Sequence, residues 1–175
     1  MYNIDEKDRV VEIEGIPQSS IGAPIPFIMS DESKVILAYY LEEKPPDWDG
    51  TSVRMVGLST NDEPIALVQF DRYKAYYFGP PNDEAFAGHP LASRGLRPYG
   101  FFQIENSSWV RQLGNMNSVH PCHMPDNFLD LKHVIISFHD SIFECVCSNF
   151  QLKIKRGSIL SLLPELTELF KTDAV

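Results

Sequence analysis

The 175-residue sequence has no long apolar run. No stretch approaches the roughly 20 consecutive apolar residues that a membrane helix needs, so we expect no membrane contact. Residues Met1–Asp8 lack the apolar core of an export signal. Cysteine is scarce, with Cys122, Cys145 and Cys147 as an odd set that predicts free thiols in a reducing compartment. We therefore expect a cytoplasmic protein.

Clustered basic residues are also missing. The 15 Lys and Arg are outnumbered by 24 Asp and Glu, which gives a net charge of -9. A nucleic-acid surface needs grouped cations to replace the counterions of the phosphates, and the nearest approach here is the short segment 153–156. We expect no nucleic-acid partner. The acidity suits either solubility alone or a basic protein partner.

Signature motifs for cofactors and metals are absent from the sequence. It holds no glycine-rich phosphate loop, no dinucleotide fingerprint, no His-Glu-x-x-His and no Cys-x-x-Cys. His120, Cys122 and His123 lie close together, but this spacing is not a zinc signature, which requires a tetrahedral set of ligands. We expect no cofactor and no metal.

The sequence does contain a series of short strand patterns. They are rich in branched and aromatic side chains or alternate in polarity, as strands do. These segments are residues 10–16, 34–42, 52–58, 65–70, 73–78, 97–104, 133–138, 142–147 and 150–155. Polar turns at 71–72 and 139–141 predict two hairpins.

Helical patterns are fewer. Residues 106–117 have an apolar face, with Asn106 or Ser107 as the N-cap, and residues 162–171 follow Ser161, a second candidate cap. Six to nine strands in hairpins with two or three short helices predict an α+β fold, mainly antiparallel sheet. With no linker visible, we expect a single domain over the whole chain.

The segment 79–96, the central loop, is too irregular for one helix or strand. Asn82 can cap a one-turn helix, and Gly95 can end a second one. Polar groups held by a rigid loop often carry function. The candidate binding residues of this loop are Asn82, Asp83, Glu84, His89 and Arg94.

Asp83, Glu84 and His89 are also the candidate catalytic residues. A histidine near a carboxylate can act as a general base around neutral pH. The structural alternative is that Asn82 and Asp83 cap a helix, Glu84 is solvated, and Arg94 pairs with an acid to hold the loop. Spacing does not decide between them, so enzymatic activity stays open.

Two other arrangements contain nucleophiles. Cys122 lies beside His120, which can activate a thiolate. Ser141 follows His139 and Asp140, but hydrolytic triads draw their members from separate parts of a fold. Residues 139–141 are better explained as hairpin-turn chemistry.

Four further residues complete the candidate binding set: His120, His139, Glu144 and Trp48. Glu144 lies inside a strand, where it either faces a cleft or is buried and paired with an arginine such as Arg94 or Arg111. Trp48 is a candidate exposed anchor, or else a lid over the core.

Two motifs occur together, Gly-Pro-Pro-Asn-Asp-Glu-Ala-Phe-Ala-Gly-His-Pro-Leu at 79–91 and Phe-His-Asp-Ser-Ile-Phe-Glu-Cys at 138–145. Residues 106–109 and 117–121 lie between them. In this order and spacing they resemble a family of small uncharacterised bacterial proteins. The resemblance covers about residues 77–148 and implies a single bacterial cytoplasmic domain, without an established activity.

The leading functional hypothesis is a binding domain that holds a protein partner or a small ligand through the central loop. An immunity or antitoxin-like role, masking a basic surface, follows by analogy alone. The alternative is a small hydrolase or transferase that uses His89 with Asp83 or Glu84 in a concave pocket. Homodimerisation through an exposed sheet edge is a further possibility.

Overall fold

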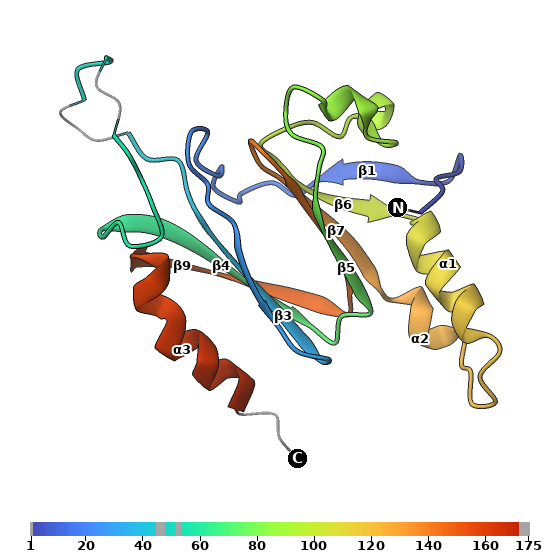
Figure 1. Cartoon of the computed structure of the whole chain (residues 1–175). Coiled ribbons are helices and arrows are strands. Elements are labelled where there is room, and N and C mark those ends of the chain that lie inside the picture. Colours follow the sequence, from blue (N-terminus) through green and yellow to red (C-terminus); the bar gives the residue numbers. More distant parts are fainter. Residues whose placement is uncertain (1, 45–47, 52–53, 172–175) are drawn as a thin grey trace. The chain divides into compact units, whose positions relative to one another are not determined.

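The computed structural model describes residues 2–44, 48–51 and 54–171. Within these residues it has nine strands in two antiparallel sheets and three α-helices, which confirms the α+β class (Figure 1). The chain divides into two compact units, one of Met1–Ile16 with Phe70–Phe150 and one of Pro17–Gln69 with Gln151–Val175. The expectation of one domain over 1–175 stays a prediction.

The first unit is built on a five-stranded sheet in the order β1-β6-β7-β8-β5. The strands are β1 (Arg9–Glu12), β5 (Ala75–Gly79), β6 (Phe101–Glu105), β7 (Lys132–Ser137) and β8 (Ile142–Cys147). β7 and β8 pair directly across the turn at 139–141, so the predicted hairpin there is confirmed. β8 is buried along its whole length. A charged residue in this strand therefore needs partners inside the protein.

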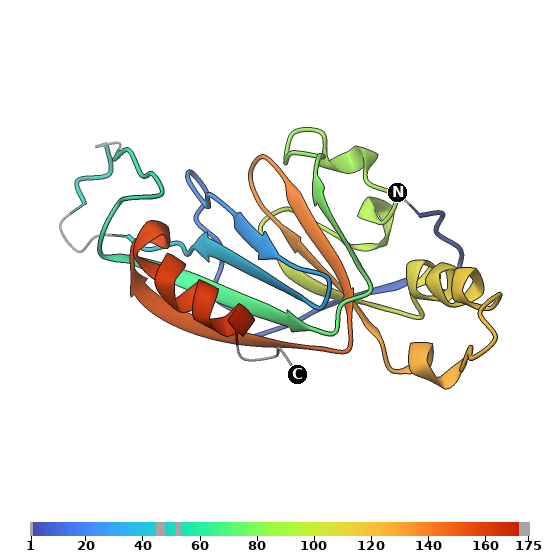
Figure 2. The same cartoon turned by 60° about the horizontal axis from the view of Figure 1, so that its bottom comes forward.

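Two helices belong to this unit, α1 (Ser108–Asn117) and α2 (Asp126–Leu129), and they lie side by side in Figures 1 and 2. Ser107 caps α1, because its hydroxyl oxygen accepts a hydrogen bond from the amide of Val110. The central loop contains two short 3-10 turns, η1 (Phe86–Gly88) and η2 (Ala92–Arg94). Gly95 ends η2 with a φ of 98°, a left-handed conformation that glycine adopts without strain.

The second unit is built on a four-stranded sheet in the order β2-β3-β4-β9. Its strands are β2 (Phe27–Ser30), β3 (Lys34–Tyr40), β4 (Glu63–Asp71) and β9 (Asn149–Gly157). Helix α3 (Ile159–Lys171) lies along this sheet (Figure 2). Its buried residues Leu162 and Leu166 pack in one apolar cluster with Ile36 and Ala38 of β3, which is why the helix stays on the sheet.

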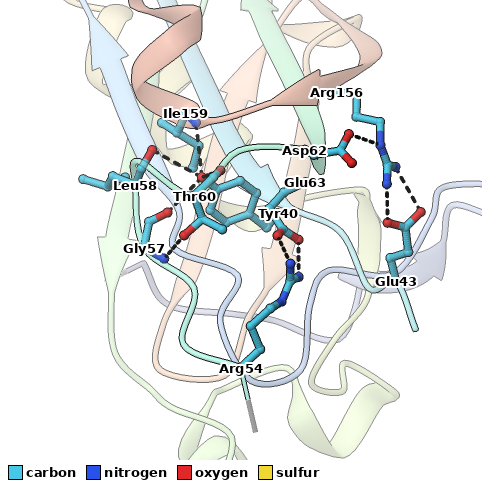
Figure 3. Close-up of polar contacts among 10 residues, drawn as sticks. All are labelled: Tyr40, Glu43, Arg54, Gly57, Leu58, Thr60, Asp62, Glu63, Arg156 and Ile159. Atoms are coloured by element: carbon cyan, nitrogen blue, oxygen red, sulfur yellow. Dashed lines mark hydrogen bonds and ion pairs between the residues drawn. The ribbon is translucent and has the colours of Figure 1, made fainter. Parts of the chain in front are cut away.

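Tyr40 joins a turn of this unit to the start of α3 (Figure 3). Its hydroxyl lies 3.0 Å from the carbonyl oxygen of Gly57 and 3.3 Å from that of Leu58, and it accepts a hydrogen bond from the amide of Ile159 at 3.2 Å. The amide of Ile159 is one of the donors that a helix start leaves without a partner in the helix. The hydroxyl of Tyr40 therefore provides hydrogen-bond partners both for a main-chain amide at the buried start of α3 and for a carbonyl oxygen of the turn.

Three details of the expected secondary structure are wrong. β4 and β5 do not form a hairpin at 71–72, because β5 pairs with β8 and β4 lies in the other sheet. Residues 54–58 are not a strand, while 52–53 lie outside the described residues. Ser161 lies inside α3, where its hydroxyl accepts a hydrogen bond from the amide of Ser158 in a reciprocal capping pair.

Candidate functional site

Glu144 is the centre of a buried polar cluster. It lies in β8 directly opposite Tyr77 of β5, and only 1% of its side chain is exposed. Oε2 accepts hydrogen bonds from the hydroxyl of Tyr2 at 2.9 Å and from Nε2 of His133 at 3.0 Å. Oε1 accepts one from Nε2 of His89 at 3.1 Å. Glu144 is thus buried and paired, by two histidines and a tyrosine.

This environment keeps the carboxylate ionised. Burial by itself would raise the pKa of Glu144, but the hydrogen bonds from His133 and His89 outweigh burial and lower the pKa to about 2. The negative charge is also felt by its neighbour, because burial and the carboxylates of Glu144 and Asp8 raise the pKa of Tyr2. The cluster is therefore a region of negative potential inside the first unit.

His89 is fixed in one tautomer. The main-chain amide of Leu91 donates to Nδ1 at 3.1 Å, so Nδ1 carries no proton and Nε2 carries the one that is donated to Glu144. The side chain is fully buried. Because both ring nitrogens are engaged, His89 does not present a free lone pair for a general base in this arrangement.

His133 extends the cluster toward α1. Its Nδ1 lies 2.8 Å from the hydroxyl of Ser107, the residue that caps α1. The ring also packs edge-on against Tyr2 and Trp109, whose rings stack on each other at 5.2 Å. His133 therefore connects Ser107, at the start of α1, to Glu144. Its ring also contacts the rings of Tyr2 and Trp109.

A pocket of about 280 Å³ opens beside this cluster, and we call it the aromatic pocket. It is lined by Tyr2, Tyr76, Tyr77, Trp109, Gln112 and Glu144. Four of these six side chains are aromatic, and one is an ionised carboxylate. Sites of this composition suit ligands with a positive charge and an apolar surface.

The central loop forms part of a second pocket of about 580 Å³, which we call the loop pocket. It is lined by Tyr77, Pro80, Pro81, Asn82, Ala85, Gly88, His89 and Asp140. Phe86, Leu91 and Leu96 hold the loop on the sheet, because they are buried in one apolar cluster with Phe102 and Ile135. Apolar side chains therefore anchor the loop to the sheet beneath it.

Asp83 and His139 form a separate, partly exposed pair. Asp83 accepts a hydrogen bond from the hydroxyl of Tyr99, and its Oδ2 lies 3.0 Å from Nδ1 of His139. Hydrogen bonds from Tyr99 and His139 lower the pKa of Asp83, and the hydrogen bond to Asp83 raises the pKa of His139. Burial and Asp83 raise the pKa of Tyr99 to about 12. This pair also ties the central loop to the β7–β8 turn.

The two candidate arginines bind elsewhere. Arg94 donates to the main-chain carbonyl oxygens of Asp5 and Asp8, at 2.9 Å in the second case. Arg111 donates to the carbonyl oxygen of Asn106 and pairs with the carboxylate of Asp5. The expectation that one of them pairs with Glu144 is wrong, because His89 and His133 make the hydrogen bonds to this buried carboxylate instead.

The other predicted residues have simpler surroundings. The side chain of Asn82 accepts a hydrogen bond from the amide of Ala85 at 3.0 Å, and Glu84 is exposed. His120 lies in an exposed loop, where its Nδ1 accepts a hydrogen bond from the amide of Cys122. Trp48 belongs to the second unit, is 48% exposed and lines a pocket of about 360 Å³.

The structure therefore joins some predicted residues and separates others. It brings His89 to Glu144 and Asp83 to His139, whereas the expected pairing of His89 with Asp83 or Glu84 does not form.

Sequence reasoning missed four members of the two clusters: Tyr2, Tyr99, Ser107 and His133. A usable signal existed for His133, because it interrupts an apolar strand just as Glu144 interrupts the next one.

The fold and site together define an antiparallel α+β protein in which a carboxylate lies buried between two histidines, beside the aromatic pocket. No protein-family model, curated protein or solved structure matches the chain. In the part of the chain that the structure describes, no group of three or more histidine, cysteine or carboxylate side chains is placed to hold a metal ion. None of the described helices combines the length and apolar character needed to cross a bilayer.

Proposed function

We propose that the protein is a non-catalytic binding domain that holds its partner through the central loop. The observation that carries this proposal is the loop pocket, one wall of which is formed by a loop with buried anchors. Its lining combines apolar surface with a few polar groups, among them Asn82 and Asp140. Ligand sites have this composition, because apolar area supplies affinity and polar groups fix orientation.

The rigidity of the loop supports a binding role. His89 is bonded to Glu144, Arg94 to the main chain of Asp5 and Asp8, and Asp83 to His139. A loop held at three separate places loses little conformational entropy when a partner binds, which favours affinity.

The charge of the chain suits a basic protein partner. The net charge is -9, and Glu84 on the loop and Asp140 at the pocket carry acidic groups to this surface. Opposite charge on a partner would speed association and select against other acidic proteins. A bacterial cytoplasmic protein of the immunity or antitoxin kind would use such a surface. The same pocket could instead hold a small ligand, and the test below distinguishes a small ligand from a protein partner.

Two matched loop variants test the proposal. Ala85 and Ala87 are both exposed, but only Ala85 lines the loop pocket. Ala85→Trp should fill the pocket and abolish capture of a specific partner from lysate of the native host, while Ala87→Trp should retain it. A small-molecule screen by NMR on the same two variants separates a small ligand from a protein. Equal behaviour of both variants toward every captured protein and compound would refute the use of this pocket.

The hydrolase or transferase alternative keeps one observation in its favour. His139 is partly exposed and bonded to Asp83, a pairing that general acid–base sites use. An enzyme of this kind would work through His139 rather than His89. His139→Gln should then abolish turnover of a substrate found by activity screening, with little change in melting temperature. Unchanged turnover in that variant would exclude this assignment.

A further inference from the structure

The aromatic pocket has a composition that selects for cations. Trp109 and Tyr2 stack on each other, and Tyr77 enters the same lining from β5. The faces of aromatic rings carry a negative partial charge that attracts ammonium groups, and tryptophan attracts them more strongly than tyrosine or phenylalanine does. The lining therefore offers attraction from the walls in addition to apolar contact.

A full negative charge lies in the same lining. Glu144 is ionised and buried, and among the described residues that line this pocket it is the one with a charged side chain. Its oxygens are held by Tyr2, His133 and His89 and only 1% of the side chain is exposed, so Glu144 acts on a ligand through its charge rather than through direct contact. In a buried setting a carboxylate attracts a cation more strongly than it does in water.

Size and lining limit the kind of cation. The volume of about 280 Å³ is at the lower end for ligand sites, which favours a small head group. A bare metal ion or a primary ammonium is held best by several converging acceptors, whereas this lining places a single carboxylate among aromatic residues. An alkylated ammonium carries its charge under a layer of methyl groups, which matches aromatic walls around a single carboxylate.

We propose that the aromatic pocket binds an alkylated ammonium group, of the trimethylammonium type found in choline and in trimethylated lysine. The cation lies against Trp109 and Tyr77, with its charge balanced by Glu144. This site shares only Tyr77 with the loop pocket, so it does not depend on the function proposed for that loop.

The first experiment compares a cation with its neutral equivalent of the same shape. Choline and 3,3-dimethylbutan-1-ol are titrated separately against the full-length protein, and the indole N–H signal of Trp109 is followed by NMR. The chain has two tryptophans, so Trp48→Phe assigns the signal. We expect choline to bind about tenfold more tightly than the neutral alcohol, as a partly desolvated cation–π contact implies. Equal affinities, or no shift with choline, would overturn the proposal.

A pair of charge variants at exposed positions of α1 tests the pocket without altering the buried cluster around Glu144. Gln112 and Asn115 are both exposed on α1, and only Gln112 lines the aromatic pocket. Gln112→Lys should weaken choline binding at least tenfold, and Asn115→Lys should leave it within twofold. Gln112→Glu should tighten choline binding without affecting the neutral alcohol. If the two lysine variants weaken binding equally, the attraction comes from overall charge and the pocket assignment fails.

A last comparison identifies the source of the group. A short peptide with trimethyllysine, the same peptide with unmodified lysine, and free choline are titrated side by side. Preference for choline indicates a small molecule, and preference for the trimethylated peptide indicates a protein partner; both support the site. Tighter binding of the unmodified peptide than of the trimethylated one would contradict it. Ala85→Trp, which fills the loop pocket, should not alter any of these affinities.

Discussion

The hydroxyl of Tyr2 lies 2.9 Å from Oε2 of Glu144, although the two residues are 142 positions apart in the chain. The contact brings the N-terminal segment to the centre of β8. Burial and hydrogen bonding make this carboxylate both a structural centre of the first unit and one surface of the aromatic pocket. Changes at Glu144 should therefore affect stability and ligand binding through the same atoms.

Glu144→Gln should destabilise the protein at neutral pH by about 3 kcal/mol, because the amide that replaces one carboxylate oxygen cannot accept the hydrogen bonds made there. Urea unfolding followed by tryptophan fluorescence measures the loss. Glu84→Gln, at an exposed carboxylate of the central loop, is the matched control and should change the free energy of unfolding by less than about 0.5 kcal/mol.

The same variant should show a defined pH dependence. The pKa of Glu144 falls from 4.5 to about 2 on folding, so its ionisation stabilises the native state fully above about pH 4.5. That contribution, about 3 kcal/mol by linkage, is lost as the pH falls toward 2. The difference between wild type and Glu144→Gln should therefore shrink across this interval. A difference that stays constant from pH 6 to pH 2 would show that the charge of Glu144 does not contribute.

His139 should titrate above its ordinary value of 6.5, because its hydrogen bond to Asp83 favours the protonated ring. NMR titration of the ring signals measures the midpoint, and Asp83→Asn should move it back toward 6.5. Since the folded pKa is raised, this pair stabilises the folded state fully below pH 6.5, and the contribution is lost as the pH rises through the folded pKa. Identical midpoints in wild type and Asp83→Asn would rule out the pair in solution.

Replacing glycine by alanine should have different effects on stability at Gly100 and at Gly88. A Cβ on Gly100 would lie 2.4 Å from the ring of Phe102, which is buried in the sheet core. Gly100→Ala should cost about 2 kcal/mol of stability, as overpacking in a core does. A Cβ on Gly88 meets nothing within 4 Å, so Gly88→Ala should be neutral or slightly stabilising. Equal melting temperatures for the two variants would contradict the packing around Gly100.

Tyr40→Phe should lower the free energy of unfolding by about 1–2 kcal/mol, because the buried amide of Ile159 loses its acceptor. Chemical denaturation measures the change. Tyr77→Phe is a suitable comparison, since it removes a tyrosine hydroxyl whose hydrogen bond to Pro80 is exposed to water. Its effect should be smaller, and the reverse order would argue against the role of Tyr40 at the start of α3.

The strands of the two sheets could be anticipated in part because side-chain preference acts locally. Segments such as 133–138 and 142–147 consist of branched, aromatic and apolar residues, and they form β7 and β8 almost as bounded in the sequence. The turn between them is short and polar, so their pairing could also be predicted from the sequence. The partner of β5 could not be predicted, because the turn at 71–72 has the composition of a hairpin turn although β5 hydrogen-bonds to β8.

Local residue preferences were enough to predict the α+β class, a helix that begins after Asn106 or Ser107, and the irregular central loop, since each depends on neighbours within a few positions. Which polar groups meet depends on the tertiary structure. His89 and His133 reach Glu144 from the central loop and from β7, and Tyr2 reaches it from the N-terminal segment. Such contacts depend on strand register and on how a loop folds over a sheet, and local residue preferences specify neither.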